Sequence, residues 1–431
     1  MMRMIDIKLF RENPELIVES EKKRFKDPAN VYKVIEFDNQ WRAIKQEIDK
    51  LKQERNQITE KVNKLKKQGN DFSKEVENVS RIKQEIPEKE ALMQEALDNR
   101  EKTRYVVGNL LHASVPTGKT EEFNVTERIW GTIPQFPFPP KGHYDLVTLI
   151  NGADLETAAK VSGARTYYLK NDLVFLNLAL IRFALDTLTD KGYTPFWTPY
   201  FIRHEVIEKA AELADFADQL YRLEGEEKLY LIATSEQTLA ALHMDEIIHP
   251  NDLPLKYTAY SACFRKEAGA HNKDTKGIFR VHQFDKIEQY IYCTPEESWN
   301  FHEELIHTTE EIYQQLEIPY RVVNIASGEM NDNAAKKYDL EGWFPAQDKY
   351  RELVSCSNCT DYQARKLNIR FGIQGGTEKH QVVHTLNSTA IATERTICCI
   401  LENNQLEDGS VKIPTVLQKY MRDKKLIPAK K

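Results

Sequence analysis

The sequence predicts an α+β protein in two parts, a long N-terminal helical hairpin and a larger domain that mixes strands with helices. Three observations lead to this prediction. Residues 34–65 repeat apolar side chains in steps of three and four, as coiled-coil helices do. Residues 263–290 alternate polar and apolar side chains on either side of a polar loop, which indicates two antiparallel strands. A chain of 431 residues also exceeds the usual size of one domain.

The composition limits the classes of protein to consider. The chain is 41% hydrophobic and 29% charged with a net charge of −6, so a nucleic-acid partner would have to bind local basic patches. No run approaches the roughly 20 apolar residues of a membrane span. The N-terminus lacks the apolar core of a secretory signal, and six cysteines in so long a chain do not make a disulfide framework. We therefore expect a cytoplasmic, reduced protein with no membrane partner.

The N-terminal region begins with apolar residues at 5–10, which suggest a short strand or turn, and a helix should start near Pro14. The two long helices of the hairpin follow, separated by a polar break at residues 66–71. Each should be roughly 50 Å long at about 1.5 Å per residue. Pro87 lies inside the second helix and should kink or split it.

The hairpin has little to bury except its own seam, so we expect it to project into solvent. One interpretation is a dimerisation or spacer coil. The other rests on a basic cluster near the tip, which suits contacts with the phosphates of A-form RNA. This cluster consists of Lys61, Lys64, Lys66, Lys67 and Lys74.

The boundaries in the middle of the chain are predicted from its proline and other turn-forming residues. Residues 105–131 read as a connector and residues 132–172 as a proline-rich entry to the second domain. A helix over residues 172–191 and a strand-like segment, TPFWTPYFI, come next. Pro199 within that segment indicates a sheet edge or an interface. Residues 229–236, LYLIATSE, predict a short buried strand that ends at a helix N-cap.

The strand pair at 263–290 carries the main chemical signal. Arg265 and Glu267 share a face of the first strand, and Phe279, Val281 and Ile287 should face the core from the second. Buried charges need partners, which a polyphosphate, a flat base and an amino group would supply. The alternative is an edge hairpin with a solvated charged face. The residues expected on the polar face of the second strand are Arg280, His282, Phe284, Lys286 and Glu288.

The C-terminal third predicts a helix over residues 296–316 and a strand–helix unit over residues 381–401, with the helix beginning near Ser388 and Arg395 buried. The segment between them contains Cys356-x-x-Cys359. Because a structural zinc site wants four ligands and no second such pair exists, we expect no zinc.

The motifs carry a family resemblance. F-R-x-E-x-G, a loop and then F-R-x-H-Q-F-x-K-x-E resembles motif 2 of class II aminoacyl-tRNA synthetases, in the version of the seryl-tRNA synthetases. The helix, strand and proline of residues 172–203 resemble motif 1. HTLNSTAIATER resembles motif 3 of the seryl branch, with Asn387, Thr389 and Ala392 where the general motif has glycines. The opening IDIKLFRENPEL and the closing ENNQLEDGSVKIP are similar to the family too, so the resemblance covers nearly the whole chain.

This resemblance implies a fold and a reaction. Residues 1–118 would form a tRNA-binding coiled-coil arm, and residues 119–431 would form a class II catalytic domain with an antiparallel β-sheet. The enzyme would activate L-serine with ATP to seryl-adenylate and pyrophosphate. It would then transfer serine to the 3′ end of tRNA(Ser), and of tRNA(Sec) where present. A homodimer would bind tRNA across its subunits.

The resemblance also assigns roles to residues. Arg265 and Arg395 would be catalytic, Glu352 and Ser355 would hold Mg²⁺ with ATP, and His271, Asn272 and Lys273 would touch the acceptor end. The ATP-binding residues would be Arg265, Lys266, Glu267, Arg280, Val281, Phe284, Glu352, Leu353, Val354, Ser355 and Arg395. The serine-binding residues would be Thr234, Ser235, Glu236, Arg265, Glu288, Asn387 and Thr389.

Three other interpretations are weighed against this one. A catalytically silent paralog would not need suitable residues at every matched position. An aminoacyl-carrier-protein ligase would lack the full arm. A coiled-coil scaffold with a decorative domain would not explain the charged strand face. The enzyme is the interpretation that accounts for all the motifs.

Overall fold

The computed structural model describes residues 5–210, 217–268, 274, 276–377 and 379–430. The chain divides into two compact units. The first ends at Gly108 and the second begins at Asn109, with residues 23–25 grouped with the second. The expected boundary at residues 118 and 119 remains a prediction.

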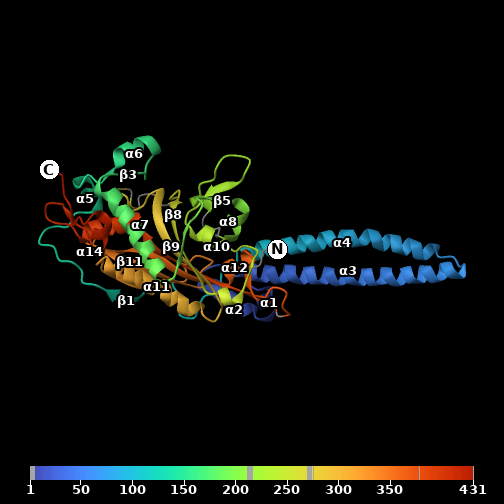
Figure 1. Ribbon diagram of the computed structural model, residues 1–431. Coiled ribbons are helices and arrows are strands. Elements are labelled where there is room, and N and C mark those ends of the chain that lie inside the picture. Colours follow the sequence, from blue (N-terminus) through green and yellow to red (C-terminus); the bar gives the residue numbers. More distant parts are fainter. Residues whose placement is uncertain (1–4, 211–216, 269–273, 275, 378, 431) are drawn as a thin grey trace. The chain divides into compact units, whose positions relative to one another are not determined.

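The first unit consists of helices (Figure 1). α3 (Ala29–Gln68) and α4 (Ser73–Tyr105) form the predicted antiparallel pair, which turns at the left-handed Gly69. At about 1.5 Å per residue, the 40 residues of α3 span ~60 Å. α1 (Ile7–Glu12) and α2 (Pro14–Lys23) precede them. The predicted start near Pro14 is therefore confirmed.

One expectation about this unit is wrong, and of the two alternatives given for Pro87, a kink or a split, the split is wrong. Residues 7–12 form a helix instead of a strand or turn, because Asp6 caps it by accepting a hydrogen bond from the Lys8 backbone N–H at 2.9 Å. α4 also continues through Pro87 without a split. The residues around Pro87 still pack, with Ile82 and Ile86 buried, and this packing offsets the lost backbone hydrogen bond.

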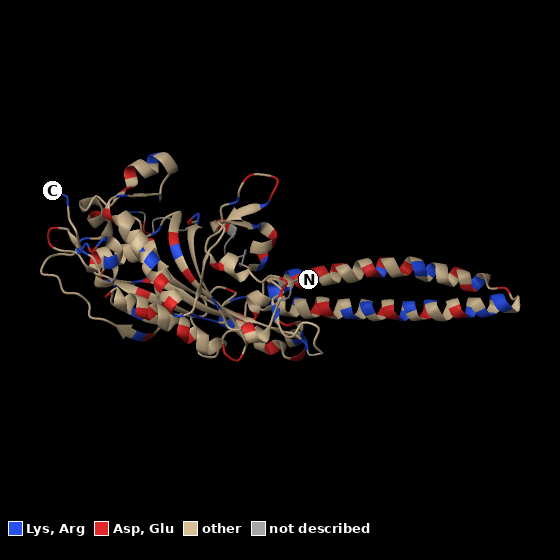
Figure 2. Cartoon of the chain, in the orientation of Figure 1, with Lys and Arg blue, Asp and Glu red and all other residues tan. Residues whose placement is uncertain are grey.

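Opposite charges join the two long helices along their length. Ion pairs connect Lys52 to Glu90 at 2.8 Å and Lys89 to Glu47 at 2.7 Å. Near the turn, Lys61 pairs with Glu75 at 2.8 Å. Figure 2 shows acidic and basic residues distributed over both helices. These exposed pairs fix the register of the hairpin more than they stabilise it.

The second unit is organised by an eight-stranded sheet in the described part of the chain, ordered β1-β10-β11-β12-β15-β9-β8-β4. Neighbouring strands are antiparallel except β4, which runs parallel to β8. The strands are β1 (Val125–Trp130), β4 (Thr194–Trp197), β8 (Leu255–Phe264), β9 (Gln283–Cys293), β10 (Tyr320–Asn324), β11 (Lys336–Phe344), β12 (Lys349–Thr360) and β15 (His384–Ala392).

Three helices cover one face of this sheet: α7 (Asp172–Asp190), α11 (Ser298–Gln315) and α13 (Thr393–Asn403). Their apolar side chains form one buried core with the strand residues that point toward them, such as Ile287 and Leu386. The predicted helices over 172–191 and 296–316 are thereby confirmed. On the opposite face, polar side chains of the central strands line a cavity, and a second buried cluster that includes Tyr290 and Tyr292 packs beside them.

The remaining elements of this unit are short. They are α5 (His143–Leu149), β2 (Ala153–Asp154), α6 (Leu155–Ser162), β3 (Tyr168–Leu169), β5 (Phe201–Arg203), α8 (His204–Ala210), β6 (Leu229–Leu231), α10 (Glu236–Ala240), β7 (Ile247–Ile248), α12 (Tyr362–Lys366), β13 (Arg370–Phe371), β14 (Gln381–Val382), β16 (Val411–Lys412), α14 (Thr415–Gln418) and β17 (Leu426–Ile427). Within the part of the chain that is described, no helix has both the length and the apolar character needed to cross a membrane.

Four boundaries in the second unit differ from the expected ones. Residues 125–130 of the expected connector form the edge strand β1. β8 ends at Phe264 and β9 begins at Gln283, so the connection between them is longer than the alternation suggested. The segment around Pro199 splits into β4 and β5. β15 continues to Ala392, and α13 begins after it instead of near Ser388, because the polar residues of 387–389 pair in the sheet.

Candidate functional site

A cavity of about 200 Å³ opens on the polar face of the sheet. Strands β9, β11, β12 and β15 supply its floor, and the connection between β8 and β9 supplies one wall. Most residues expected to bind ATP or serine line this one cavity. They are Thr234, Glu236, Arg265, Glu267, Arg280, Val281, Phe284, Glu288, Glu352, Leu353, Ser355, Asn387, Thr389 and Arg395.

Three expected site residues lie outside the cavity lining. Ser235 is fully buried at the start of α10. The exposed Lys266 has its ammonium nitrogen 5.8 Å from the centre of the Tyr221 ring. Val354 belongs to the apolar core, because its side chain leaves the opposite face of β12 from Ser355. A contact of these residues with a ligand would have to use the backbone.

A β-bulge explains how Glu352 and Ser355 reach the same cavity. Residues three apart in a regular strand point to opposite faces. In β12, however, Glu352 pairs with Glu341 and Val354 pairs with Leu340, so Leu353 is an extra residue. The bulge turns Glu352 back onto the face that Ser355 occupies. The chain thus places a carboxylate and a hydroxyl side by side on the cavity floor.

The floor next to β9 follows the predicted alternation. Phe284, Lys286 and Glu288 line the cavity, whereas Ile287 is in the core. Glu288 forms an ion pair with Lys286, and its carboxylate accepts a hydrogen bond from the Thr389 hydroxyl at 3.4 Å. Glu288 and Thr389 are also direct cross-strand partners. A carboxylate and a hydroxyl therefore face the same point of the cavity.

Glu236 completes this carboxylate group from α10. Its Oε1 accepts hydrogen bonds from Asn387 Nδ2 at 3.0 Å and Gln363 Nε2 at 2.9 Å. Desolvation, together with the nearby Glu288 carboxylate, raises the pKa of Glu236 to about 7. Desolvation also raises the pKa of Glu288 above its ordinary value, despite Lys286. Two buried carboxylates at such a site favour a cationic ligand.

The other end of the cavity is cationic. Arg280 Nη1 pairs with Glu267 at 2.9 Å, and Arg395 Nη1 lies 3.3 Å from Glu352 Oε1. Burial alone would raise the pKa of Glu352, but Arg395, Lys337, Arg265 and Arg280 together hold it below its ordinary value. Glu352 is therefore an ionised carboxylate among cations, a setting that suits phosphates and a hard metal ion.

Two aromatic rings of the cavity lining lie close to arginines. The Arg265 guanidinium carbon is 5.1 Å from the centre of the Phe284 ring, and the Arg395 carbon is 5.3 Å from that of Phe279. Arg395 is half-buried, so the expectation that it is buried is wrong in degree.

Some lining residues were not assigned from the sequence. Phe279 lines the cavity although it was expected only in the core, and it is buried as well. Lys337 also lines it, next to Asp339, whose pKa burial raises to about 7. The alternation Lys337, Asp339, Glu341 along β11 was the available signal, because it gives one strand a second charged face.

The C-x-x-C cysteines are possible metal ligands outside the cavity. Cys356 and Cys359 are both buried in β12. Across the described residues, no group of three or more His, Cys, Asp or Glu side chains could hold a metal ion. Glu352 and Ser355 could contribute two oxygens to an ion that a nucleotide brings with it.

The expected tRNA contacts lie elsewhere in the chain. Of the arm lysines, Lys66 and Lys67 are in the last turn of α3 and Lys74 is near the start of α4. Lys61 is already paired with Glu75. The expected acceptor-end contacts at His271, Asn272 and Lys273 lie outside the described residues.

Comparisons with known proteins agree with this geometry. Residues 221–404 match the family model of the tRNA synthetase class II core domain (G, H, P, S and T), and residues 4–111 match that of the seryl-tRNA synthetase N-terminal domain. The serine–tRNA ligase of Methanosphaera stadtmanae is 56% identical, over 99% of this chain and 100% of that protein. The serine–tRNA ligase of Helianthus annuus is 50% identical, over 98% of each chain.

Solved structures are similar over the same extent. The seryl-tRNA synthetase from Pyrococcus horikoshii complexed with ATP has a TM-score of 0.96 and 47% identity, covering 99% of this chain and 100% of that one. The cytoplasmic serine–tRNA ligase from Naegleria fowleri in complex with AMP has a TM-score of 0.93 and 40% identity, covering 100% of both chains. Both of those structures contain an adenine nucleotide, ATP in the first and AMP in the second.

Proposed function

The chain belongs to the seryl-tRNA synthetases, and from this membership we infer that it is a serine–tRNA ligase of class II. It activates L-serine with ATP and transfers the serine to tRNA(Ser). The observation that carries the residue-level proposal is the single cavity, which is lined by a group of carboxylates, a group of cations and two aromatic rings.

In the first step, a carboxylate oxygen of serine attacks the α-phosphorus of ATP. The bond from that phosphorus to the bridging oxygen breaks, and pyrophosphate leaves. We assign Arg265 to both the serine carboxylate and the α-phosphate, since a guanidinium fork suits each. Arg280 would neutralise the outer phosphates. Such positioning and charge stabilisation need no covalent participation by the enzyme.

The adenine would lie between Phe284 on one face and Arg395 on the other, with Glu267 accepting a hydrogen bond from its amino group. The backbone of Lys266, Val281, Leu353 and Val354 would complete the nucleotide site.

In the second step, a hydroxyl of the terminal ribose of tRNA attacks the activated carbonyl, and AMP leaves.

Serine would be recognised at the carboxylate end. Its ammonium would bind between Glu236 and Glu288, and its hydroxyl would reach Glu288 and Thr389. Thr234, Ser235 and Asn387 would shape the pocket. A buried site built to hydrogen-bond a hydroxyl rejects an analogue that lacks it, because its own polar groups are then left unpaired.

Mg²⁺ would be held by Glu352 and Ser355 together with the phosphates of ATP. The bulge at Leu353 and the lowered pKa of Glu352 support this assignment. When bound, the ion would neutralise phosphate charge as pyrophosphate leaves.

The remaining partners rest on the family and on surface character. Residues 1–118 would bind tRNA(Ser), and tRNA(Sec) where present, while residues 119–431 perform the chemistry, in the cytoplasm. A homodimer that binds tRNA across its subunits is supported by exposed apolar side chains along α7 and β4, which would be covered by a second copy. These are Val174, Phe175, Leu178 and Trp197.

Serine-dependent exchange of labelled pyrophosphate into ATP tests the first step. We expect exchange with serine, and rates with alanine and threonine lower by about 10³ or more. Alanine lacks the hydroxyl, and threonine adds a methyl group to an enclosed pocket. Equal exchange with alanine would contradict the serine assignment of Glu288 and Thr389. Absence of exchange with all three would contradict the function itself.

The raised pKa of Glu236 predicts a pH dependence. Above pH 7 the carboxylate is ionised and attracts the serine ammonium, and below pH 7 it is protonated and does not. The KM for serine should therefore be about tenfold higher at pH 6 than on its plateau above pH 8. In Glu236→Gln the KM should be raised at every pH and should stay flat over this range. The assignment fails if the wild type and the variant have the same pH profile.

A further inference from the structure

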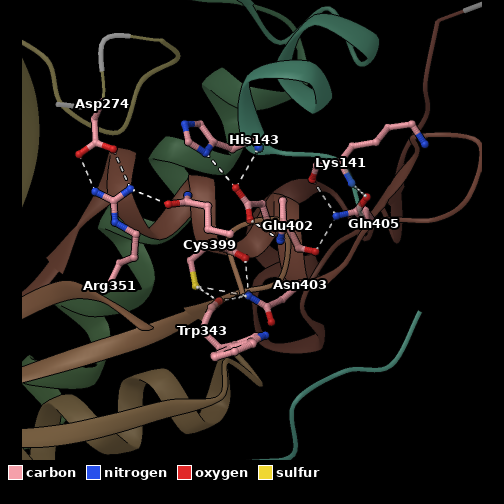
Figure 3. A network of polar contacts seen from close by, with 11 residues as sticks. Lys141, His143, Asp274, Trp343, Arg351, Cys399, Glu402, Asn403 and Gln405 are labelled. Carbon is pink, nitrogen blue, oxygen red and sulfur yellow. Dashed lines mark hydrogen bonds and ion pairs between the residues drawn. The ribbon is translucent and has the colours of Figure 1, made fainter. Parts of the chain in front are cut away.

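An ion pair outside the cavity ties the connection between β8 and β9 to the floor of the sheet (Figure 3). Arg351 Nη1 lies 2.7 Å from Asp274 Oδ1, and Arg351 Nη2 lies 2.5 Å from Asp274 Oδ2. Both side chains are largely buried, with 14% and 20% of their side-chain surface exposed. Neither residue lines the cavity. This two-bond arrangement, here called the Asp274–Arg351 clamp, is the strongest geometry available to such a pair.

The clamp acts on the segment that carries the nucleotide-binding residues. Residues 265–282 leave β8 with Arg265 and Glu267 and return to β9 through Phe279 and Arg280. A connection of this length has many conformations, so holding its ends near each other does not fix its middle. Asp274 lies in that middle, and burial of its charge is offset by Arg351, which holds its pKa below the ordinary value.

Arg351 also contacts the segment at a second point. Its guanidinium carbon lies 4.0 Å from the centre of the Phe279 ring, which is a cation–π distance. Phe279 packs edge-on against Phe344 at 5.4 Å and also lines the cavity. Arg280, proposed to bind the phosphates, is the next residue. Arg351 thus contacts both Asp274 and the Phe279 ring, and Phe279 directly precedes Arg280, the proposed phosphate ligand.

The base beneath the clamp is itself braced. Arg351 Nη1 donates to Gln347 Oε1 at 2.9 Å. The adjacent Ala346 N–H donates to Glu402 of α13 at 3.2 Å, and Glu402 also accepts from His143 Nδ1 at 2.9 Å. Figure 3 shows Glu402 next to His143, with Gln405 in the same network of polar contacts.

His143 supports the same connection from below. A Cβ at Gly277, where φ is +79°, would lie 2.7 Å from His143 Nε2. The connection therefore rests directly on the imidazole, and only glycine fits there. Although burial lowers its pKa, the Cys398 thiol and Glu402 raise the pKa of His143 to about 10. Because His143 and Glu402 form a charged, buried pair, they hold in place the segments that support the clamp.

We infer that the Asp274–Arg351 clamp is a positioning device for ATP, a role that rests on the proposed function. It holds Asp274 and residues 276–280 in place before the nucleotide arrives, so ATP does not have to order them. Serine binds at the opposite end of the cavity, on β9, β15 and α10, which the clamp does not touch. The clamp should therefore affect ATP and leave serine binding unchanged.

A double-mutant cycle with exchange kinetics tests this inference. Arg351→Met keeps the aliphatic stem and removes the fork, and Asp274→Asn removes the charge. Each should raise the KM for ATP about tenfold and leave the KM for serine within twofold. The effect of the double variant should be smaller than the sum of the two single effects, because the ion pair is shared even though Arg351 also contacts Phe279 and Asp274 also lies 3.8 Å from Arg280 Nε. Arg351→Lys, which keeps the charge without the fork, should fall between the wild type and Arg351→Met.

A matched control separates positioning from general stability. Arg128 forms a similar half-buried fork with Glu310, at 2.9 and 2.6 Å, at the far edge of the sheet. Arg128→Met should lower the Tm by about as much as the clamp variants do. It should change neither the KM for ATP nor the KM for serine. Hydrogen–deuterium exchange of residues 276–282 should be faster in the clamp variants alone.

The inference is overturned if ATP and serine KM rise together, if the single effects add, or if the KM for ATP does not change. Pyrophosphate exchange by the wild-type protein is the reference for every variant. Its absence would refute the proposed function, whereas normal wild-type exchange with unaffected variants would refute only the clamp.

Discussion

Replacing Arg265 with methionine should reduce the kcat/KM of serine-dependent pyrophosphate exchange by about 10³. Arg265 follows the last residue of β8, lines the cavity and is half-buried. Its Nε donates one hydrogen bond, to the carbonyl of Ala233 at 3.3 Å, which leaves its terminal nitrogens for the ligands. Loss of one preorganised charge-stabilising group costs about 10²–10³ in rate, and Arg265 is proposed to contact both reacting partners.

The choice of substitution isolates that effect. Methionine keeps apolar contact with Phe284, so the variant should fold like the wild type. Arg265→Lys keeps the charge without the planar fork and should recover only part of the activity. Arg128→Met controls for the loss of an arginine elsewhere in the sheet. Exchange within tenfold of wild type in Arg265→Met would remove Arg265 from the catalytic role.

The sequence predicted what depends on local periodicity. The seam of the arm, the helix of α7 and the two faces of β9 follow from side-chain spacing alone, and the structure confirms them. Two of the predictions that were wrong have different causes. At α1 the missed signal is local, because Asp6 caps the helix through the backbone N–H of Lys8, two residues later. At β15 a tertiary contact overrides spacing, because pairing with β9 and β12 carries that strand past Ser388 to Ala392.

The site shows the same limit. Alternation along β12 would put Glu352 and Ser355 on opposite faces, and only a family resemblance placed them together. The reason is the bulge at Leu353, which depends on how β11 aligns with β12 and which leaves no clear mark in the local sequence. The Asp274–Arg351 clamp joins residues 77 positions apart, so spacing could not reveal it.

Shortening the arm should separate the two half-reactions. We expect a variant in which a glycine-rich turn joins Glu47 to Lys89 to retain exchange within about twofold. Its kcat/KM for charging tRNA(Ser) should fall by about 10³ or more. Glu47 and Lys89 are ion-paired at 2.7 Å, so a short turn can connect them. The base of the arm is kept, including the buried Asp38 with its partners Arg11 and Arg100.

A milder variant tests the lysines themselves. Changing Lys61, Lys64, Lys66, Lys67 and Lys74 to glutamine removes charge and keeps the helices. If these residues contact phosphates, the dependence of tRNA KM on salt should weaken by about 0.9 per contact in a log–log plot. Lys61 should contribute least, because Glu75 already pairs with it. An unchanged salt slope would place the tRNA contacts on other residues of the arm.

The separation is expected because every residue that lines the cavity belongs to the second unit. The sites proposed for serine, ATP and Mg²⁺ therefore take no group from the arm, and exchange should need nothing else. Charging has a further requirement, since the terminal ribose must be delivered to an adenylate that the cavity already holds. In a chain with a net charge of −6, that delivery depends on local basic surface. Loss of exchange together with charging in the shortened variant would instead show that the arm supports the catalytic unit itself.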